Sequence, residues 1–278
     1  MQRSTHIQVT NRDHMKKKIT ILLCCVALLL IIGWGAKEIY SQLHPPKDPE
    51  IVADLCFGKS GDTNYLVYVK ENGKYTPYIV IDTKNYGDEA VLLLRKDVYM
   101  KEMMYRDANI FGTGGAYYNG SIVDVFLEDE FYNVFSEKMK SIIRESPVRI
   151  HTSRFVEKRR MEGEPFLETI YRHVFVLSAA ELDAPLIRDK ERDEGDVIPE
   201  ALKNPVLLYT WLRSEAIGGD DTHASLWYNT AVVSNHIQNG AEHYVRPVFT
   251  VNRNEPVELR IIETEEFSGE VYVFPSDQ

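Results

Sequence analysis

Two arginines, Arg213 and Arg246, lie in predicted strands beside bulky apolar residues, so each is expected to have a buried or half-buried stem. Two converging guanidinium groups would form a clamp for a carboxylate or phosphate group of a ligand. The alternative is structural, with each arginine bound to loop carbonyls or to a carboxylate such as Glu181. Because a buried charge without a partner is costly, one of these partners must exist. The sequence favours the structural role and leaves the clamp open.

Aromatic side chains are the second source of binding chemistry, because exposed rings stack on sugar rings and extended peptides. Trp227, Tyr228 and Asn229 follow a loop rich in glycine and aspartate, a usual place for a binding edge. Trp211 lies in the apolar run LLYTWL and is expected in the core. For Trp227 and Tyr228 the core and the surface both remain open. The predicted binding residues are Trp227, Tyr228, Asn229, Arg213 and Arg246.

Motifs for metal binding or catalysis are weak. The loop GGDDTH at residues 218–223 has two carboxylates but lacks the further spaced ligands of a calcium loop. The run GTGG at residues 112–115 lacks the other residues of a nucleotide-binding loop. No Gly-x-Ser-x-Gly elbow is present. We therefore predict no metal site, no cofactor and no catalysis. An enzyme stays an alternative, because scattered serines, histidines and acids could assemble a triad in space.

Composition and charge limit the partners. The 278 residues carry a formal net charge of −10, and an acidic surface repels phosphate backbones, so we expect no nucleic-acid partner. The three cysteines are Cys24, Cys25 and Cys56, so no disulfide can form among residues 57–278. Cys56 is either a small buried apolar residue or a partner for its twin in a neighbouring chain.

Residues 19–35 (ITILLCCVALLLIIGWG) are uncharged and apolar, at the short end of what spans a bilayer. Lys16, Lys17 and Lys18 precede them directly, and the positive-inside rule then places the N-terminus in the cytoplasm. The alternative is a cleaved secretory signal. Both interpretations put the rest of the chain outside the cytoplasm. The predicted organisation is a cytoplasmic segment (1–18), a single transmembrane helix (19–35), a proline-containing linker (36–56) and an extracytoplasmic domain (57–278) at the plasma membrane.

The domain begins and ends with strand patterns. Alternating runs at residues 65–70 and 76–82 flank Asn72-Gly73, a strong hairpin signal because both turn positions need positive φ. Asn239-Gly240 supplies a second hairpin signal. Further strands are predicted at residues 89–95, 173–177, 206–213, 225–234, 242–251, 257–263 and 270–274.

The middle of the domain is predicted to be helical. Ser121 with Asp124 forms a capping box before an apolar run, and Ser136 is the predicted N-cap of a second helix, which Pro147 ends. Ser178-x-x-Glu181 is another capping box and predicts a brief helix. The order of strands, two helices and strands favours an α+β fold that is mostly antiparallel, with a central pair of helices.

Five stretches of the domain, in the right order, resemble the bacterial domain of unknown function 6273 family. Glu215 stands where that family has proline, and Tyr244 stands where it has glycine. The resemblance covers about residues 65–252 and implies a secreted or surface-anchored module. A looser similarity links the closing strands to the C-type-lectin-like fold of formylglycine-generating enzymes. The five stretches are residues 86–94, 117–143, 174–182, 211–214 (WLRS) and 244–251 (YVRPVFTV).

These observations predict a membrane-anchored, extracytoplasmic binding module that recognises a glycan, a cell-wall component or a protein. The first alternative is a structural or assembly protein of the cell envelope without a small ligand. The second alternative is an uncharacterised extracytoplasmic enzyme.

Overall fold

The computed structural model describes residues 48–56, 65–105, 117–151, 167–182, 197–198, 206–215, 223–229, 231–236, 241–263 and 267–275. The predicted membrane segment and the runs at residues 112–115 and 218–222 lie outside this part of the chain. Within the described residues no helix is long and apolar enough to cross a bilayer. The chain divides into two units, Met1–Asp48 and Pro49–Gln278, and all of the described helices and strands belong to the second.

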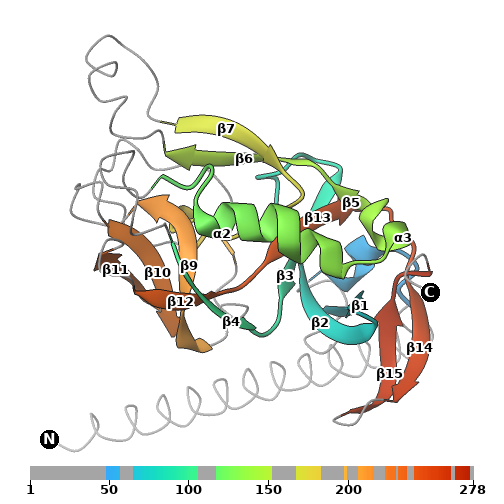
Figure 1. The fold of residues 1–278 in the computed structure, drawn as a ribbon. Helices are drawn as coiled ribbons and strands as arrows, with labels where there is room; N and C mark the ends of the chain where they lie inside the picture. The colour runs from blue at the N-terminus through green and yellow to red at the C-terminus, as the bar shows by residue number, and fades with distance from the viewer. Residues whose placement is uncertain are drawn as a thin grey trace, which may run out of the picture. The chain divides into compact units, whose positions relative to one another are not determined.

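An eight-stranded sheet forms one part of the domain (Figure 1). Its strand order is β14-β15-β1-β2-β3-β13-β5, and β8 also pairs with β13. All of its pairs are antiparallel except β1 with β15. The strands are β1 (Leu66–Glu71), β2 (Lys74–Ile81), β3 (Ala90–Arg95), β5 (Ile143–Arg144), β8 (Val174–Phe175), β13 (Val248–Asn252), β14 (Glu258–Glu263) and β15 (Ser268–Val273).

Two smaller sheets complete the strands. A five-stranded sheet has the order β11-β10-β9-β12-β4, and a two-stranded ribbon pairs β6 with β7. The strands are β4 (Tyr99–Met104), β6 (Ser146–His151), β7 (Leu167–Arg172), β9 (Val206–Glu215), β10 (His223–Asn229), β11 (Ala231–His236) and β12 (Glu242–Val245). In Figure 1, β7 is the outer strand of its ribbon, at the top of the view.

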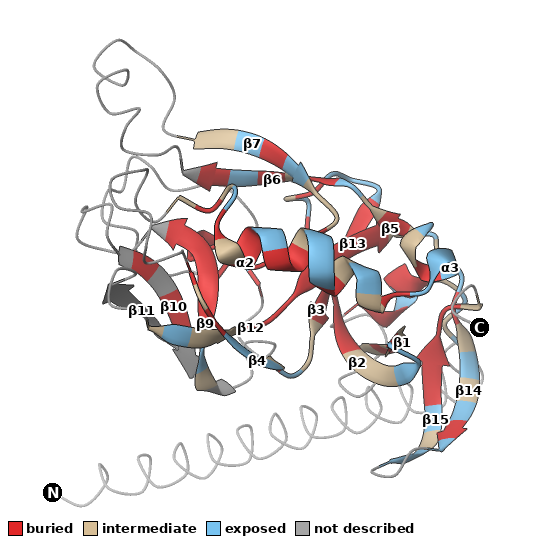
Figure 2. Ribbon diagram, viewed as in Figure 1, coloured by how far each residue is buried: buried red, intermediate tan, exposed pale blue. Residues whose placement is uncertain are grey.

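One 13-residue helix, here named the central helix, runs from residue 122 to residue 134. It begins as α2 (Ile122–Val125), widens into a π-helical stretch (Phe126–Phe131) and ends in a 3-10 turn (Tyr132–Val134). The predicted cap is confirmed, because the Ser121 side chain accepts a hydrogen bond from the Asp124 N–H at 3.1 Å. The central helix packs against β4 and β8, and Figure 2 shows one side of it buried and the other exposed.

The second predicted helix is much shorter than expected. Ser136 caps α3 (Glu137–Lys140) as predicted, accepting from the Met139 N–H at 3.0 Å, but α3 is a single turn. Ile143 then pairs with Val251 of β13, and Pro147 lies in β6 instead of ending a helix. Pairing with the sheet therefore overrides the local helical spacing. The fold is mostly β, with one long helix instead of a pair.

The first predicted hairpin is confirmed, and the second signal falls on residues that the structure does not describe. Asn72 and Gly73 have φ values of 49° and 81° between the paired strands β1 and β2. Asn239-Gly240 lies outside the described residues, and the strands before and after it, β11 and β12, are not neighbours in the five-stranded sheet.

Two predicted strands are each divided in the structure. Residues 225–234 contribute to both β10 and β11, which pair with each other as a hairpin. Residues 242–251 contribute β12 to the five-stranded sheet and β13 to the eight-stranded sheet, and the chain changes sheet at Arg246-Pro247. Arg246 therefore lies where the two large sheets meet.

The domain starts earlier than its composition predicts. A 3-10 helix, Val52–Leu55, lies within the range predicted as linker, and Val52, Leu55 and Cys56 are fully buried in the main hydrophobic core. The Val52 N–H donates to the Glu255 C=O at 2.8 Å. Of the two roles left open for Cys56, its position is that of a buried apolar residue.

Candidate functional site

Arg213 lies in the interior, where groups from three parts of the chain hold its guanidinium. Its side chain is 2% exposed and lies 2.9 Å from the carboxylate of Glu181, which is 3% exposed. Nε donates to the Arg149 C=O at 3.0 Å, and Nη1 donates to the Val176 C=O at 2.6 Å. These are the partners that the structural alternative predicts for this arginine.

Glu181 ends a second capping box that the sequence predicts correctly. The Ser178 N–H donates to Glu181 Oε2 at 2.8 Å, and the Glu181 N–H donates to Ser178 Oγ at 3.2 Å. The hydroxyl of Tyr86 donates to the same carboxylate. Burial alone would raise the pKa of Glu181, but the Arg213 charge and these hydrogen bonds lower it below its ordinary value. Glu181 is thus held as a buried carboxylate.

Arg246 is buried, and no carboxylate of the described residues pairs with its guanidinium. Nε donates to the Arg95 C=O at 2.7 Å, Nη2 donates to the Lys96 C=O at 2.8 Å, and the group lies 4.7 Å from the centre of the Trp227 ring. Burial lowers the pKa of Arg246 to about 9, against a raising effect of the Asp97 charge. The arginine fixes the turn after β3 against β10.

The predicted binding residues do not meet in one place. Arg213 and Arg246 share no partner among the described residues, so the predicted clamp of two converging guanidinium groups is not formed there. Trp227 is only 2% exposed and is packed under Arg246, so its ring does not offer a face to a ligand. Trp211 is in the core, as expected. The side chains of Tyr228 and Asn229 lie outside the described part of the structure.

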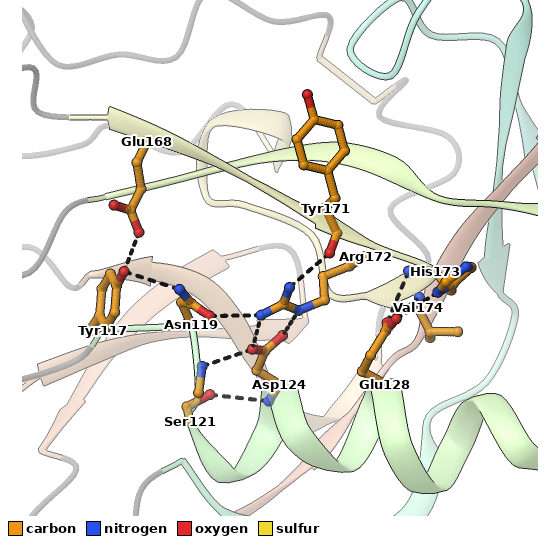
Figure 3. A network of polar contacts seen from close by, with 11 residues as sticks. Tyr117, Asn119, Ser121, Asp124, Glu128, Glu168, Tyr171, Arg172, His173 and Val174 are labelled. Atoms are coloured by element: carbon orange, nitrogen blue, oxygen red, sulfur yellow. Dashed lines mark hydrogen bonds and ion pairs between the residues drawn. The ribbon is translucent and has the colours of Figure 1, made fainter.

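A different set of polar side chains gathers between the central helix and β7 (Figure 3). Arg172 of β7 donates from Nε and Nη2 to the two carboxylate oxygens of Asp124, both at 2.8 Å. Nη2 also donates to Asn119 Oδ1 at 2.7 Å. Asp124 is 2% exposed and accepts from the Gly120 N–H at 2.8 Å. This paired and buried carboxylate fastens the start of the helix to β7.

The outer end of this network is half-exposed. The hydroxyl of Tyr117 donates to the carboxylate of Glu168, and Asn119 Nδ2 donates to the Tyr117 hydroxyl oxygen at 3.3 Å. Burial, followed by the hydrogen bond to Glu168, raises the pKa of Tyr117. Figure 3 shows Glu168 pointing toward Tyr117, whereas the ring of Tyr171 points away from the network. We name Tyr117, Asn119 and Glu168 the outer triad.

A histidine–carboxylate pair closes the other end. His173 Nδ1 lies 2.6 Å from Glu128 Oε1, and the same carboxylate accepts from the His173 N–H at 2.9 Å. The imidazole stacks on Tyr132 with 4.6 Å between ring centres. Histidine and glutamate are also common metal ligands, but no cluster of three or more such ligands is found in the described part of the chain. The pair holds β8 against the central helix.

Sequence reasoning found the capping residues of this region but not the outer triad. Glu168 falls in residues 151–170, a stretch so dense in charged residues that its sequence indicates a surface excursion. Its partner Tyr117 is distant in sequence, so their contact depends on tertiary structure. The alternation of Glu168, Ile170 and Arg172 on one face of β7 was the available signal.

The fold and the site define a mostly β domain with a polar network that opens to the surface between a helix and a β-ribbon. A family model described as "Domain of unknown function (DUF6273)" matches residues 88–253. The match covers more than half of the chain, and the chain belongs to this family. The resemblance found in the sequence is therefore confirmed. No curated protein and no solved structure matches the chain, so the looser similarity to the C-type-lectin-like fold receives no support.

Proposed function

We propose that this chain is a membrane-anchored, extracytoplasmic binding module and that the outer triad contacts its ligand, a glycan or other hydroxyl-bearing component of the cell wall. The observation behind the proposal is that an aromatic ring, a carboxylate and an amide lie together, half-exposed, at Tyr117, Glu168 and Asn119. Sugar rings stack on aromatic faces, and their hydroxyl groups bond to carboxylates and amides.

The interior networks support a rigid platform beneath the outer triad. Asp124 and Arg172 tie the helix start to β7, and Glu181 and Arg213 tie the loop after β8 to β9. Binding groups that are held by such contacts lose less freedom when a ligand arrives. The triad therefore suits recognition of a ligand in a fixed orientation.

The anchor and its orientation are part of the same proposal. The uncharged run at residues 19–35 follows three lysines, which favours a cytoplasmic N-terminus and an exported domain. The acidic composition fits a domain that meets cell-wall polymers and not nucleic acid.

A thermal-shift screen of the full chain in detergent tests the proposal with a panel of cell-wall fragments and neutral oligosaccharides. A ligand at a hundred times its Kd stabilises the fold by about 2.7 kcal/mol, which raises Tm by roughly 5–10 °C for a domain of this size. Tyr117→Ala is expected to remove that rise. Tyr117→Phe, which keeps the ring and loses the hydroxyl, is expected to reduce it.

Tyr171→Ala is the matched control, because Tyr171 is 59% exposed but points away from the network. This variant should keep the full rise in Tm. A rise that survives Tyr117→Ala would remove the outer triad from the binding site. A flat panel over a sharply melting domain would favour the envelope assembly protein.

A further inference from the structure

The outer edge of β7 lacks a neighbouring strand in the part of the chain that the structure describes. β7 pairs only with β6 there, and it forms the outer side of the ribbon in Figure 1. Its residues read Leu-Glu-Thr-Ile-Tyr-Arg, with two charged side chains, Glu168 and Arg172, and no proline.

Three contacts fix which backbone groups point outward. In an antiparallel pair, the N–H and C=O of one residue point to the same side, and successive residues alternate. The Arg149 C=O accepts from Arg213 and therefore points away from β7. Pro147 lies two residues before Arg149 on β6, so its backbone groups point to the same side as those of Arg149, away from β7. This fits its lack of an N–H to donate, and Pro147 lies opposite Tyr171. The Tyr171 C=O accepts from Arg172 Nη1 at 2.8 Å, on the side away from β6.

Thr169 and Tyr171 therefore face the open edge with their backbone groups. They lie opposite Arg149 and Pro147 in positions that are not hydrogen-bonded across the ribbon. The side chains of both residues are exposed. A strand that added here would leave the bonds between β6 and β7 unchanged, and it would share the Tyr171 C=O with Arg172 Nη1, because a carbonyl oxygen can accept two hydrogen bonds.

We propose that β7 pairs antiparallel with the β7 strand of a second copy of this chain, about a two-fold axis at Ile170. In this register Thr169 lies opposite Tyr171 of the partner subunit, and the two pairs exchange four backbone hydrogen bonds. The two ribbons become one four-stranded sheet in the order β6-β7-β7-β6. An isologous contact of this kind closes with two subunits.

The charges on β7 favour a second copy over an unrelated strand. Glu168 and Arg172 lie at equal distances in sequence from Ile170 and carry opposite charges. The two-fold axis places Glu168 opposite Arg172 of the partner subunit, and Arg172 opposite Glu168 of the partner subunit. Within each chain Arg172 stays paired with Asp124 and Glu168 stays bonded to Tyr117, so the facing charges add to these contacts and do not replace them. Opposite charges at facing positions stabilise a strand pair, and like charges destabilise it. When two β7 strands pair about Ile170, with the outward backbone groups of Thr169 and Tyr171 facing each other, each charged side chain therefore lies opposite one of the other sign.

Light scattering on the full chain in detergent, corrected for bound detergent, gives the first test. The expected protein mass is twice the 32.0 kDa of one chain. Thr169→Pro removes an outward N–H without touching the bonds to β6, and it should reduce the mass to one chain. Thr169→Val keeps that N–H and should stay dimeric. A monomeric wild-type chain, or a Thr169→Pro variant as dimeric as wild type, would overturn the proposal.

Cross-linking gives a second test that does not depend on the folding of the proline variant. Facing residues of a hydrogen-bonded pair have Cα atoms about 5.5 Å apart, within reach of a disulfide. The double variant Thr169→Cys, Tyr171→Cys should therefore form a disulfide between positions 169 and 171 of two chains, located by peptide mass mapping. Thr169→Cys alone should not form one at this position. Absence of the link in the double variant, or equal linkage in the single variant, would contradict the pairing.

Discussion

Buried charges at single residues are held by partners from distant parts of the chain. Arg213 and Glu181 are each no more than 3% exposed, and each satisfies the other in the interior. Removing one member leaves the other charged and buried, which costs more than the pair contributes. These positions therefore govern stability more than any surface ion pair does.

Arg213→Met is expected to lower the free energy of unfolding by about 3–5 kcal/mol, because Glu181 keeps its place but loses its cation. Urea denaturation measures the change. The matched control is Arg253→Met, which removes an exposed pair with Asp82 at 3.5 Å. That loss should stay within about 1 kcal/mol. Equal losses in the two variants would contradict the role given to burial.

The pKa of Glu181 predicts how this contribution depends on pH. Its pKa is lowered in the folded state, so the carboxylate stabilises the fold fully above the unfolded value of about 4.3. The contribution is lost as the pH falls through the lower, folded value. The difference in unfolding free energy between wild type and Glu181→Gln should therefore shrink from about pH 6 to about pH 3. A difference that is constant over this range would show that Glu181 is not the titrating group.

At the scale of the elements, capping side chains fix where the helices begin, and the start of the central helix can be tested directly. Ser121→Ala removes the acceptor for the Asp124 N–H and should cost about 1 kcal/mol of stability. Ser121→Gly should cost only a few tenths of a kcal/mol, because glycine is itself a favoured N-cap residue. Urea unfolding of the two variants checks the order. An alanine variant as stable as wild type would mean that the helix start is fixed by Arg172 and Asp124 alone.

Features that depend on neighbours in sequence could be predicted, and those that depend on distant partners could not. The Asn72-Gly73 turn and the caps at Ser121, Ser136 and Ser178 follow from side-chain chemistry within four residues. The lengths of the elements do not, because β13 draws Ile143 into a sheet where the apolar spacing alone predicts helix. Pairing of the strands on either side of Asn239-Gly240 is likewise set by distant partners, because β11 pairs with β10 and β12 pairs with β9 and β4.

The candidate site shows the same division. Glu181 could be named in advance as one candidate partner of Arg213, because a buried arginine needs hydrogen-bond acceptors and this carboxylate ends a predicted cap. Trp227 could not be assigned, since its burial depends on Arg246 lying over the ring. The contact between Tyr117 and Glu168 joins residues 51 positions apart in the sequence, so no local pattern contains it.

For the whole molecule, the proposed topology makes a prediction about location. The full chain should sediment with membranes and resist extraction at alkaline pH, because the run at residues 19–35 has no charge to draw it into water. Protease added outside intact cells should degrade the domain and spare a tag at the N-terminus. A mature protein whose measured mass corresponds to a chain starting near residue 36 would instead establish a cleaved signal.

The parallel pairing of β1 with β15 has a consequence for how the domain is made. β1 lies between β2 and β15 in the large sheet, so the edge of the first strand stays open until nearly the last residues arrive. Contacts between such distant segments form slowly. Under the proposed topology β1 crosses the membrane before β15, so the pair of β1 with β15 forms only after β15 has also crossed. A chain that stalls short of β15 leaves this edge of β1 unpaired, and we expect it to be degraded sooner than the full chain.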